Sequence, residues 1–332
     1  MGEQRTRRRD NDLSTPPEDA KPDKPTQLGR RSWWGVLKRT VKEFQQDNLT
    51  DWAAALTYYS VLSIFPGLLV LLSLFSMFGD VDAAKKQVQA EAGGGFAKIA
   101  EPLLNNLQTA PKTAGVLAIA GLLGAVWSAS GYVGAFMRAS NAIYDVPEGR
   151  PIWKTIPIRL GVTIATGLLL AITAAAVVFT GAVAERTGNA IGLESQFVTV
   201  WDIVKWPVLV AIVSFMFALL YWASPNARQG GFRWVTPGGV VAVALWIIAS
   251  AGFALYISMF ANYSKTYGAL GGVIIFLVWL WISNIAILLG AEFDAELERG
   301  RAIEAGHPAD KEPFVELRDD RKVKKGQDTD LR

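Results

Sequence analysis

The sequence contains no cysteine and only one histidine, His307. The absence of cysteine excludes a disulfide framework and thiolate metal ligands. The histidine lies in a polar C-terminal stretch with no His/Asp cluster around it, so we expect neither a metal site nor a cofactor. A hydrolytic nuclease needs metal-binding carboxylates and histidines, or a histidine-based acid and base. We therefore expect no enzyme activity and no nucleic-acid partner.

Charge is also missing, from six windows of at least 22 residues: 52–79, 113–137, 160–184, 206–227, 234–264 and 266–291. A helix needs roughly 20 apolar residues to cross a bilayer core of about 30 Å. Buried helices of soluble proteins are shorter and keep a polar face. The pattern predicts an all-α, polytopic membrane protein with six transmembrane helices, at about 53–78, 113–137, 158–184, 205–223, 235–261 and 268–291.

Lysine and arginine are distributed unevenly between the two sides of these spans. The two tails and the loops at 138–159 and 228–233 hold 26 of the 33, whereas the opposite loops hold 7. Because cytoplasmic loops carry the excess of positive charge, we expect both termini in the cytoplasm and the chain in the lipid bilayer of a bacterial inner membrane. Lys265 then lies in a tight external turn between the last two spans.

The segments outside the spans differ in composition. Residues 1–31 are rich in proline and charge, and predict a disordered tail. Residues 32–47 place Trp33, Leu37, Val41 and Phe44 at helical spacing, as in an amphipathic helix of the headgroup region. A helix packed on the ends of its neighbours explains that spacing nearly as well. Residues 48–300 form the predicted transmembrane domain, and 301–332 a second disordered, charged tail.

Polar groups at mid-depth are the first candidates for a substrate path, because a polar group in hydrocarbon is costly unless it finds a partner. Pro66 is a further candidate for the substrate path, because a proline inside a helix removes a backbone hydrogen bond and favours a kink. The candidates are Tyr58, Tyr59, Ser63 and Pro66 in the first span, Ser128 and Ser130 in the second, and Asn284 in the sixth. Helix-to-helix hydrogen bonding is the simpler explanation for the hydroxyl and amide groups.

The predicted cytoplasmic edge carries the second set of candidates: Arg138, Asn141 and Glu292. Arg138 ends the second span and Glu292 ends the sixth, so a pair between them would form an inner gate. Ordinary helix-end charges that fix the spans in the membrane are the alternative.

Several motifs resemble the YihY/virulence-factor BrkB family of bacterial inner-membrane proteins. They include "LTYYSVLSIFPGLLVLLSL", "WSASGYVGAFMRASNAIYDVPEGRPIW" and "NYSKTYGALGGVIIFLVWLWISNIAILLGAEFDAELER", within residues 33–300. The resemblance implies six membrane helices and a turn motif that here comprises Asn262, Tyr263, Tyr267, Gly268 and Gly271. Lys265 occupies a free position of that motif, which favours a solvated turn residue. Members of the family have been named ribonuclease, serum-resistance factor and lipid exporter.

Two functions remain open on the sequence. The first is a transporter or exporter of an amphipathic or lipid-like substrate, favoured by the polytopic fold, the mid-span proline and the polar groups of the first span. The second is a membrane scaffold that organises envelope enzymes without transport. No nucleotide-binding loop occurs in the sequence, so transport would be driven by a gradient or by a partner.

Overall fold

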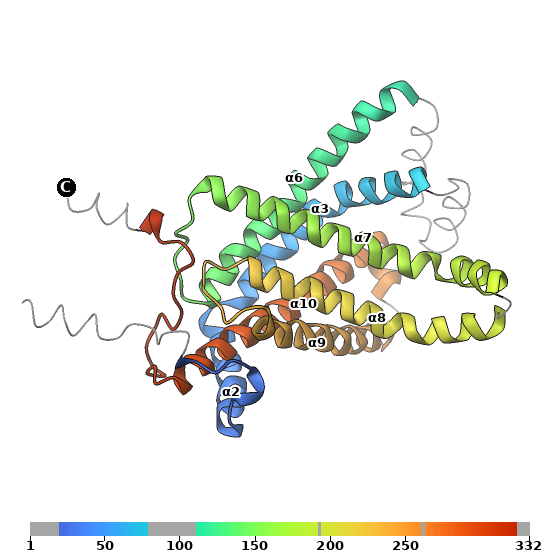
Figure 1. The fold of residues 1–332 in the computed structure, drawn as a ribbon. Helices are drawn as coiled ribbons and strands as arrows, with labels where there is room; N and C mark the ends of the chain where they lie inside the picture. The colour runs from blue at the N-terminus through green and yellow to red at the C-terminus, as the bar shows by residue number, and fades with distance from the viewer. Residues whose placement is uncertain (1–19, 79–110, 192–193, 260–262, 324–332) are drawn as a thin grey trace, which may run out of the picture. The chain divides into compact units, whose positions relative to one another are not determined.

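A computed structural model describes residues 20–78, 111–191, 194–259 and 263–323 (Figure 1). Within those ranges the secondary structure is helical, and pairing of extended backbone is limited to an isolated bridge between Ala227 and Leu317. The helices are η3 (Pro25–Gln27), α2 (Arg30–Gln46), α3 (Leu49–Phe78), α6 (Pro111–Ile143), α7 (Ile152–Ile191), α8 (Glu194–Ala223), α9 (Phe232–Met259) and α10 (Tyr263–Glu304).

The chain divides into two compact units. Unit 1 comprises residues 1–57 and 136–332, and unit 2 comprises residues 58–135. Unit 1 therefore holds α2, the first turns of α3, the last turns of α6, and α7 to α10. Within it α7 packs on α8, α8 on α9, α9 on α10, and α2 on α10.

Four helices of unit 1 are long and apolar enough to cross a membrane, in the segments Ile152–Thr173, Ile203–Ala223, Phe232–Ser258 and Gly271–Glu304. They coincide with the last four of the six predicted spans. The first two predicted spans fall on α3 and α6, which are helices of 30 and 33 residues. Large apolar side chains of α7 to α10 face outward, among them Leu168, Ile248 and Leu255, and a lipid environment would cover them.

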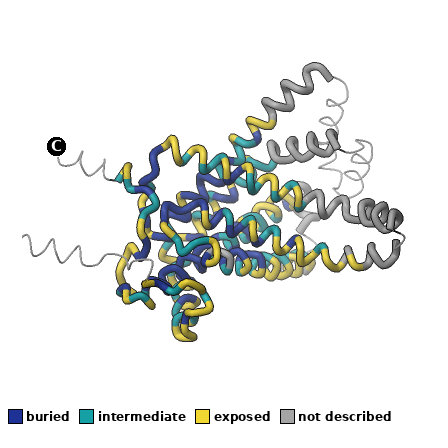
Figure 2. Tube along the Cα trace, in the orientation of Figure 1, coloured by how far each residue is buried: buried dark blue, intermediate teal, exposed yellow. Residues whose placement is uncertain are grey.

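Burial in unit 1 is concentrated where α10 ends (Figure 2). We call this region the charged end. It comprises α2, the α6–α7 connection, the α8–α9 connection, the last turns of α10 and residues 305–323. An apolar cluster at its centre joins Leu28 and Val36 to Trp234, Phe293 and Leu297. The most buried part of unit 1 thus lies within the charged end, while the apolar surfaces of the long helices are left for lipid.

The helices α9 and α10 approach each other closely through two glycines. A Cβ atom on Gly238 would lie 2.2 Å from the carbonyl oxygen of Gly290, and one on Gly290 would lie 2.6 Å from that of Gly238. Only residues without a side chain allow this contact, as is common between membrane helices. The approach brings the amide nitrogen of Gly238 to 2.7 Å from Oδ1 of Asp294, so it positions an acidic side chain of the charged end.

The structure differs from the expected organisation at both flanks of the last span. Residues 263–268, expected in the external turn, form the first turns of α10, and Asn262 lies outside the described residues. Residues 301–304, expected in a disordered tail, continue α10. Residues 305–323 then pack along unit 1, with Phe314 and Val315 each 1% exposed. Two buried apolar side chains in an otherwise polar stretch are too weak a pattern to have been recognised in the sequence.

Candidate functional site

Four acidic side chains are buried along the last turns of α10. Glu292, Asp294, Glu296 and Glu298 are each no more than 2% exposed. Alternate residues of a helix point in different directions, so these four carboxylates must be balanced by several different elements. Burying a carboxylate is costly unless it is paired and hydrogen-bonded, and the partners therefore define how the charged end is built.

Glu298 lies among donors from the N-terminal segment, the α8–α9 connection and the next turn of α10. Its Oε1 is 3.0 Å from Nη1 of Arg301 and 3.8 Å from Nζ of Lys21, and its Oε2 accepts a hydrogen bond of 3.0 Å from the amide of Gly230. Arg301 also stacks over the ring of Trp234, with 5.2 Å between its Cζ and the ring centroid. This carboxylate is fully paired, and its arrangement is typical of a structural site.

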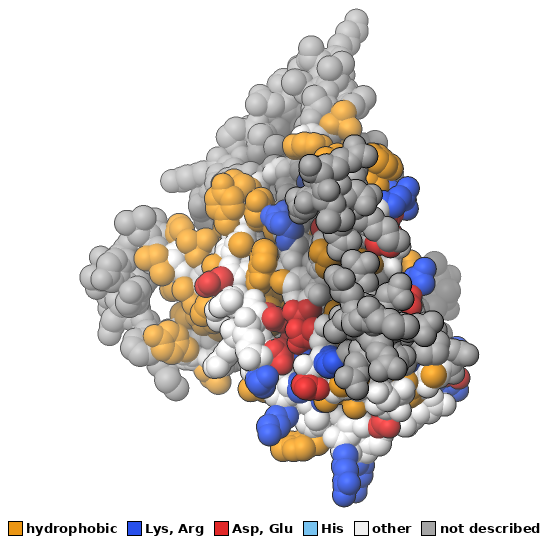
Figure 3. Space-filling model, turned by 90° about the vertical axis from the view of Figure 1, so that its left-hand side faces the viewer, with side chains coloured by type: hydrophobic (Ala, Val, Ile, Leu, Met, Phe, Trp, Pro, Cys, Tyr) orange, Lys and Arg blue, Asp and Glu red, His pale blue; other side chains and the backbone are white. Residues whose placement is uncertain are grey.

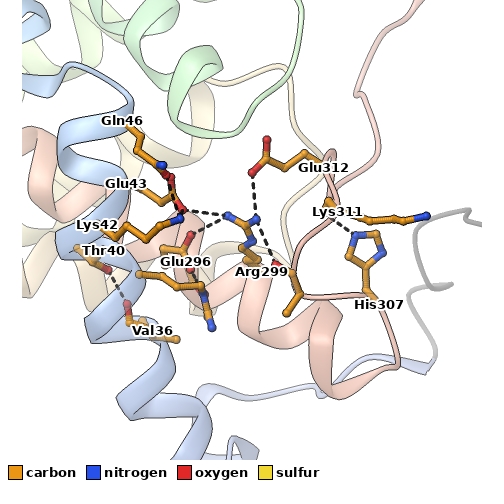
Figure 4. Close-up of polar contacts among 12 residues, drawn as sticks. Val36, Thr40, Lys42, Glu43, Gln46, Glu296, Arg299, His307, Lys311 and Glu312 are labelled. Carbon is orange, nitrogen blue, oxygen red and sulfur yellow. Dashed lines mark hydrogen bonds and ion pairs between the residues drawn. The ribbon is translucent and has the colours of Figure 1, made fainter.

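Glu296 connects α10 to α2. Nε of Arg39 donates to its Oε2, and Nη1 of Arg299 lies 3.3 Å from its Oε1. Arg299 also reaches Glu43 on α2, at 3.7 Å, and Glu312 in the C-terminal segment, at 3.0 Å. Figure 4 shows the guanidinium group of Arg299 between the carboxylates of Glu43, Glu296 and Glu312. Arg299 thus joins three segments that are far apart in the sequence.

A cavity of about 580 Å³ opens beside this network. Charged side chains make up most of its wall, and Figure 3 shows acidic side chains gathered next to basic ones on this end of the molecule. Ten residues line it: Arg39, Lys42, Glu43, Gln46, Asp47, Asp145, Arg299, Ala309, Asp310 and Glu312. The acidic residues outnumber the basic ones by five to three, so the cavity wall carries a net negative charge when all of its acids are ionised.

Three of these acids lack a basic partner. In the described part of the chain, no lysine or arginine lies within ion-pair distance of Asp47, Asp145 or Asp310. Partial burial, with Glu312, Asp47 and Glu43 nearby, raises the pKa of Asp145 from 3.8 to about 7, although Arg299 opposes the shift. Burial likewise raises the pKa of Asp47 from 3.8 to about 6. Both carboxyl groups therefore titrate near neutral pH.

Asp47 also forms a hydrogen bond with the side chain of Glu292. Two carboxyl groups can share a hydrogen bond only when one of them holds a proton. Among the described residues, Oε2 of Glu292 has no hydrogen-bond partner. The Asp47–Glu292 contact therefore joins the end of α2 to α10 next to the cavity wall.

The expected pair between Arg138 and Glu292 does not form. The side chain of Arg138 is exposed, whereas Glu292 is 1% exposed and lies against Asp47. The prediction rested on the two residues lying at the same depth in the membrane. Equal depth is not enough to form an ion pair, because the helical phase of α6 turns the side chain of Arg138 outward. The inner gate proposed for that pair is therefore wrong.

Asn141 holds a different position from the one expected for a gate. Its Oδ1 accepts a hydrogen bond of 2.7 Å from the amide of Asn226, and its Nδ2 donates to Oε2 of Glu148 at 3.0 Å. Asn226 in turn bonds the backbone of Asp319 at 2.9 and 3.1 Å. Glu148 forms an ion pair of 2.6 Å with Arg150, whose hydrogen bonds lower the pKa of that carboxyl group even though partial burial opposes the shift. Asn141 therefore joins the two helix connections to the C-terminal segment.

Residues 316–319 close this arrangement over the end of α8. Nε of Arg318 lies 2.8 Å from the carbonyl oxygen of Ala227, and Nη2 donates to that of Trp222 at 2.5 Å. Nζ of Lys154 lies 2.8 Å from Oδ2 of Asp319, and hydrogen bonds from Arg321 and Lys154 hold the pKa of Asp319 well below its ordinary value. The C-terminal segment therefore acts as a strap across the connections of unit 1.

The polar groups expected at mid-depth mostly form hydrogen bonds within helices or between neighbouring helices. In unit 2, Oγ of Ser63 donates to the carbonyl oxygen of Tyr59 at 2.7 Å, Ser130 donates to Trp127 at 2.7 Å, and Ser128 donates to Leu62 at 3.1 Å.

The rings of Tyr58 and Tyr59 are 5.4 Å apart and meet edge to face. In unit 1, Nδ2 of Asn284 donates to Oγ1 of Thr57 at 3.1 Å. Pro66 lies in a stretch of α3 whose side chains are not described. The same holds for Tyr263, Tyr267 and Gly268 in α10, whereas Gly271 in α10 is buried.

Sequence reasoning did not select Arg39, Glu43, Asp47, Asp145 or Arg299. A signal existed only for the first three, which follow one another at intervals of four and so share one face of α2 and its C-terminal end. Nothing in the sequence joins that face to Asp145 or Arg299. Among the described residues no group of three or more histidines or acids is arranged to hold a metal ion.

Comparisons with known proteins place these features in a family. The family model described as virulence factor BrkB matches residues 40–314. The chain is 32% identical over 261 residues to a ribonuclease-like protein, YfkH, of Bacillus subtilis strain 168, covering 77% of this chain and 92% of that one.

Two further relatives are named as membrane proteins. The chain is 28% identical to a UPF0761 membrane protein of Chromohalobacter salexigens, covering 83% of this chain and 67% of the relative. It is also 28% identical to one of Alteromonas mediterranea, covering 82% and 90%. No solved structure matches the chain.

Proposed function

The chain belongs to the virulence factor BrkB family of membrane proteins, and from that membership we propose that it transports or exports an amphipathic or lipid-like substrate. The observation that carries the proposal is the cavity at the charged end. It has room for a polar headgroup, its wall holds both signs of charge, and three of its acids lack basic partners among the described residues. Such a wall suits a headgroup with a positive group.

The proposed arrangement in the membrane follows the lysine and arginine distribution. The charged end faces the cytoplasm, six helices cross a bacterial inner membrane, and the cavity receives substrate from the cytoplasm or the inner leaflet. The contact between the carboxyl groups of Asp47 and Glu292 lies next to the cavity, so proton movement is a candidate coupling. Supporting this, Asp47 and Asp145 change charge close to neutral pH, where a proton gradient would act on them.

We also propose that the chain is not a ribonuclease. The name of the Bacillus relative describes that protein, and the residues of this chain offer little for RNA cleavage. The lone histidine, His307, is 6% exposed, and its Nε2 lies 3.1 Å from the carbonyl oxygen of Lys311. A ring that is buried against its own segment is poorly placed to exchange protons with a substrate.

A scaffold for envelope enzymes is the second candidate. The network around Glu296, Arg299 and Arg39 is internally paired, and the strap ties the connections together. Fixed ion-pair networks of this kind hold a surface in one shape, which a scaffold needs and a transporter must break. A scaffold would tolerate loss of the cavity acids as long as the fold survives.

The test is lipid translocation by the purified protein in proteoliposomes. Fluorescent short-chain lipids with ethanolamine, choline and glycerol headgroups are placed in one leaflet, and their transfer is followed by chemical quenching. We expect transfer of a lipid with a positive headgroup group, and at least about a tenfold loss in Asp47→Asn/Asp145→Asn. Glu316→Gln is the control, because Glu316 is an exposed acid outside the cavity lining.

Equal lipid transfer by Asp47→Asn/Asp145→Asn and by Glu316→Gln would contradict the role of the cavity. Absence of transfer for every headgroup, together with unchanged lipids and metabolites in a deletion strain, would favour the scaffold. Co-purification of envelope enzymes with the wild-type protein, and its persistence in Asp47→Asn/Asp145→Asn, would then support that alternative.

A further inference from the structure

The helix α2 has two faces of different character. One face packs on α10: Val36 is fully buried, and the rings of Trp33 and Phe293 are 6.2 Å apart. The other face carries three large apolar side chains that remain exposed, Trp34 at 71%, Leu37 at 48% and Val41 at 72%. Positions i, i+3 and i+7 form one stripe along a helix, so these three side chains make a continuous apolar surface.

The exposed apolar stripe lies on a different face of the helix from the apolar face that the sequence predicted. The expected apolar face included Trp33 and Phe44, but Trp33 is occupied by its contact with α10. Adjacent tryptophans at 33 and 34 point about 100° apart, so one can anchor the helix to α10 while the other faces outward. Packing against α10 and an outward apolar surface therefore occur together, and the two explanations for this helix are not exclusive.

The charges around the exposed stripe are all of one sign. Arg30, Arg31 and Lys38 are exposed beside it, whereas Lys42 forms an ion pair with Glu43 at 3.4 Å and lines the cavity. The only acid of α2, Glu43, lies on the other side, where it faces Arg299. A helix with apolar side chains flanked by basic ones has the composition of segments that lie in an anionic headgroup layer.

We propose that this face of α2 binds the anionic headgroup layer of the membrane that holds the long helices, with Trp34, Leu37 and Val41 inserted and the basic side chains on lipid phosphates. Two features argue for lipid as the occupant. The positive charges complement phosphodiester groups. The face is also within reach of the bilayer, because α2 packs on the membrane-crossing helix α10.

A protein partner fits this surface less well. A stable protein interface takes about 20–30 residues from each side, whereas the exposed apolar stripe has three large side chains. By helical spacing, Arg30 lies in line with the stripe, and Arg31 and Lys38 lie along one side of it, so these residues do not form a rim around a pocket. Lipid phosphates, which are mobile in the plane of the membrane, can meet all three of them at once.

The test uses the cysteine-free chain, in which a single introduced cysteine is the only labelling site. The full-length protein carries a nitroxide on Val41→Cys, and Glu316→Cys gives the reference for an exposed position in the C-terminal segment. Both are reconstituted in nanodiscs of phosphatidylcholine alone, or with about 30% phosphatidylglycerol. We measure how often the nitroxide collides with each of two reagents, oxygen and a nickel chelate. Oxygen concentrates in the bilayer, whereas the nickel chelate is water-soluble.

In anionic nanodiscs, we expect the ratio of oxygen collisions to nickel collisions at Val41→Cys to exceed the ratio at Glu316→Cys by at least about fivefold. The ratio should fall in neutral nanodiscs and in the charge variant Arg31→Gln/Lys38→Gln. The control variant Lys311→Gln/Lys322→Gln removes the same charge from exposed residues outside α2 and should leave the ratio unchanged.

Three results would overturn the proposal. A label as accessible to nickel as the reference in both lipid mixtures would mean that the face stays in water. Equal protection in neutral and anionic nanodiscs would remove the role of anionic headgroups. Protection in detergent without lipid, with a second protein retained, would assign the face to a protein partner. Size-exclusion profiles of each variant show that the fold is kept.

Discussion

The close approach of α9 and α10 gives the sharpest test of the fold. In Gly238→Ala the new methyl group would lie 2.2 Å from the carbonyl oxygen of Gly290 and 2.3 Å from Cγ of Asp294. Ordinary contacts of such atoms begin near 3.4 Å, so the two helices must move apart by about 1 Å. Backbone and a buried carboxylate form the obstacle, and neither can turn aside as a flexible side chain would.

The magnitude follows from two opposing effects. Overpacking a tight contact costs about 1–3 kcal/mol, and weakening the hydrogen bond from the amide of Gly238 to Asp294 adds about 1–3 kcal/mol. The greater helix propensity of alanine returns at most about 1 kcal/mol. We therefore expect a net loss of about 3 kcal/mol for Gly238→Ala.

Gly252→Ala on the same helix is the matched control, because a Cβ atom there meets no atom within 4 Å. Thermal unfolding of the detergent-solubilised protein, followed by the fluorescence of its 12 tryptophans, compares the variants. Gly238→Ala should unfold at a clearly lower temperature than the wild type, and Gly252→Ala at the same or a slightly higher temperature. Equal unfolding temperatures for the two variants would refute the close contact between α9 and α10.

Three further predictions concern the charged end and the topology. Asp145→Asn should remove a pH dependence: the folded-state pKa of about 7 exceeds the ordinary 3.8, so wild-type stability falls as pH rises through this window. Because this carboxyl group is partly exposed, we expect the variant to gain only about 1 kcal/mol at pH 8 and nothing below pH 4; a pH-independent difference in unfolding temperature would contradict this. Arg318→Ala should release the strap, which limited proteolysis detects as faster cleavage after residue 304. Arg321→Ala should matter less, since among the described residues the side chain of Arg321 bonds only its near neighbour Asp319. Reporter fusions in loops 138–159 and 228–233 should report cytoplasm and one at Lys265 the outside, and a cytoplasmic signal at Lys265 would overturn the six-span topology.

The sequence located the long apolar helices and indicated the family to which the chain belongs. Span positions follow from the absence of charge, which is a local property, since each 20-residue window meets the bilayer independently of its neighbours. The helix at 32–47 was predicted from the helical spacing of its apolar residues, which is also a local property, and α2 is observed at Arg30–Gln46. Glu292 was expected at the end of the last span, and it lies with Asp294, Glu296 and Glu298 in the last turns of α10.

Tertiary structure alone decided how those acids are used. Arg39 and Glu296 are separated by 257 residues, and no period in the sequence connects them. Depth in the membrane suggested Arg138 as the partner of Glu292, but the phase of α6 turns Arg138 outward and the turn after α2 brings Asp47 to Glu292 instead. The sequence predicted a disordered tail where the strap lies. The strap is held by contacts of Arg318 and Asp319 with carbonyl and amide groups of a helix connection that is distant in the sequence. Helical phase is encoded locally, whereas the choice of neighbouring helix, and with it the partner of each buried charge, is set only when the whole chain packs.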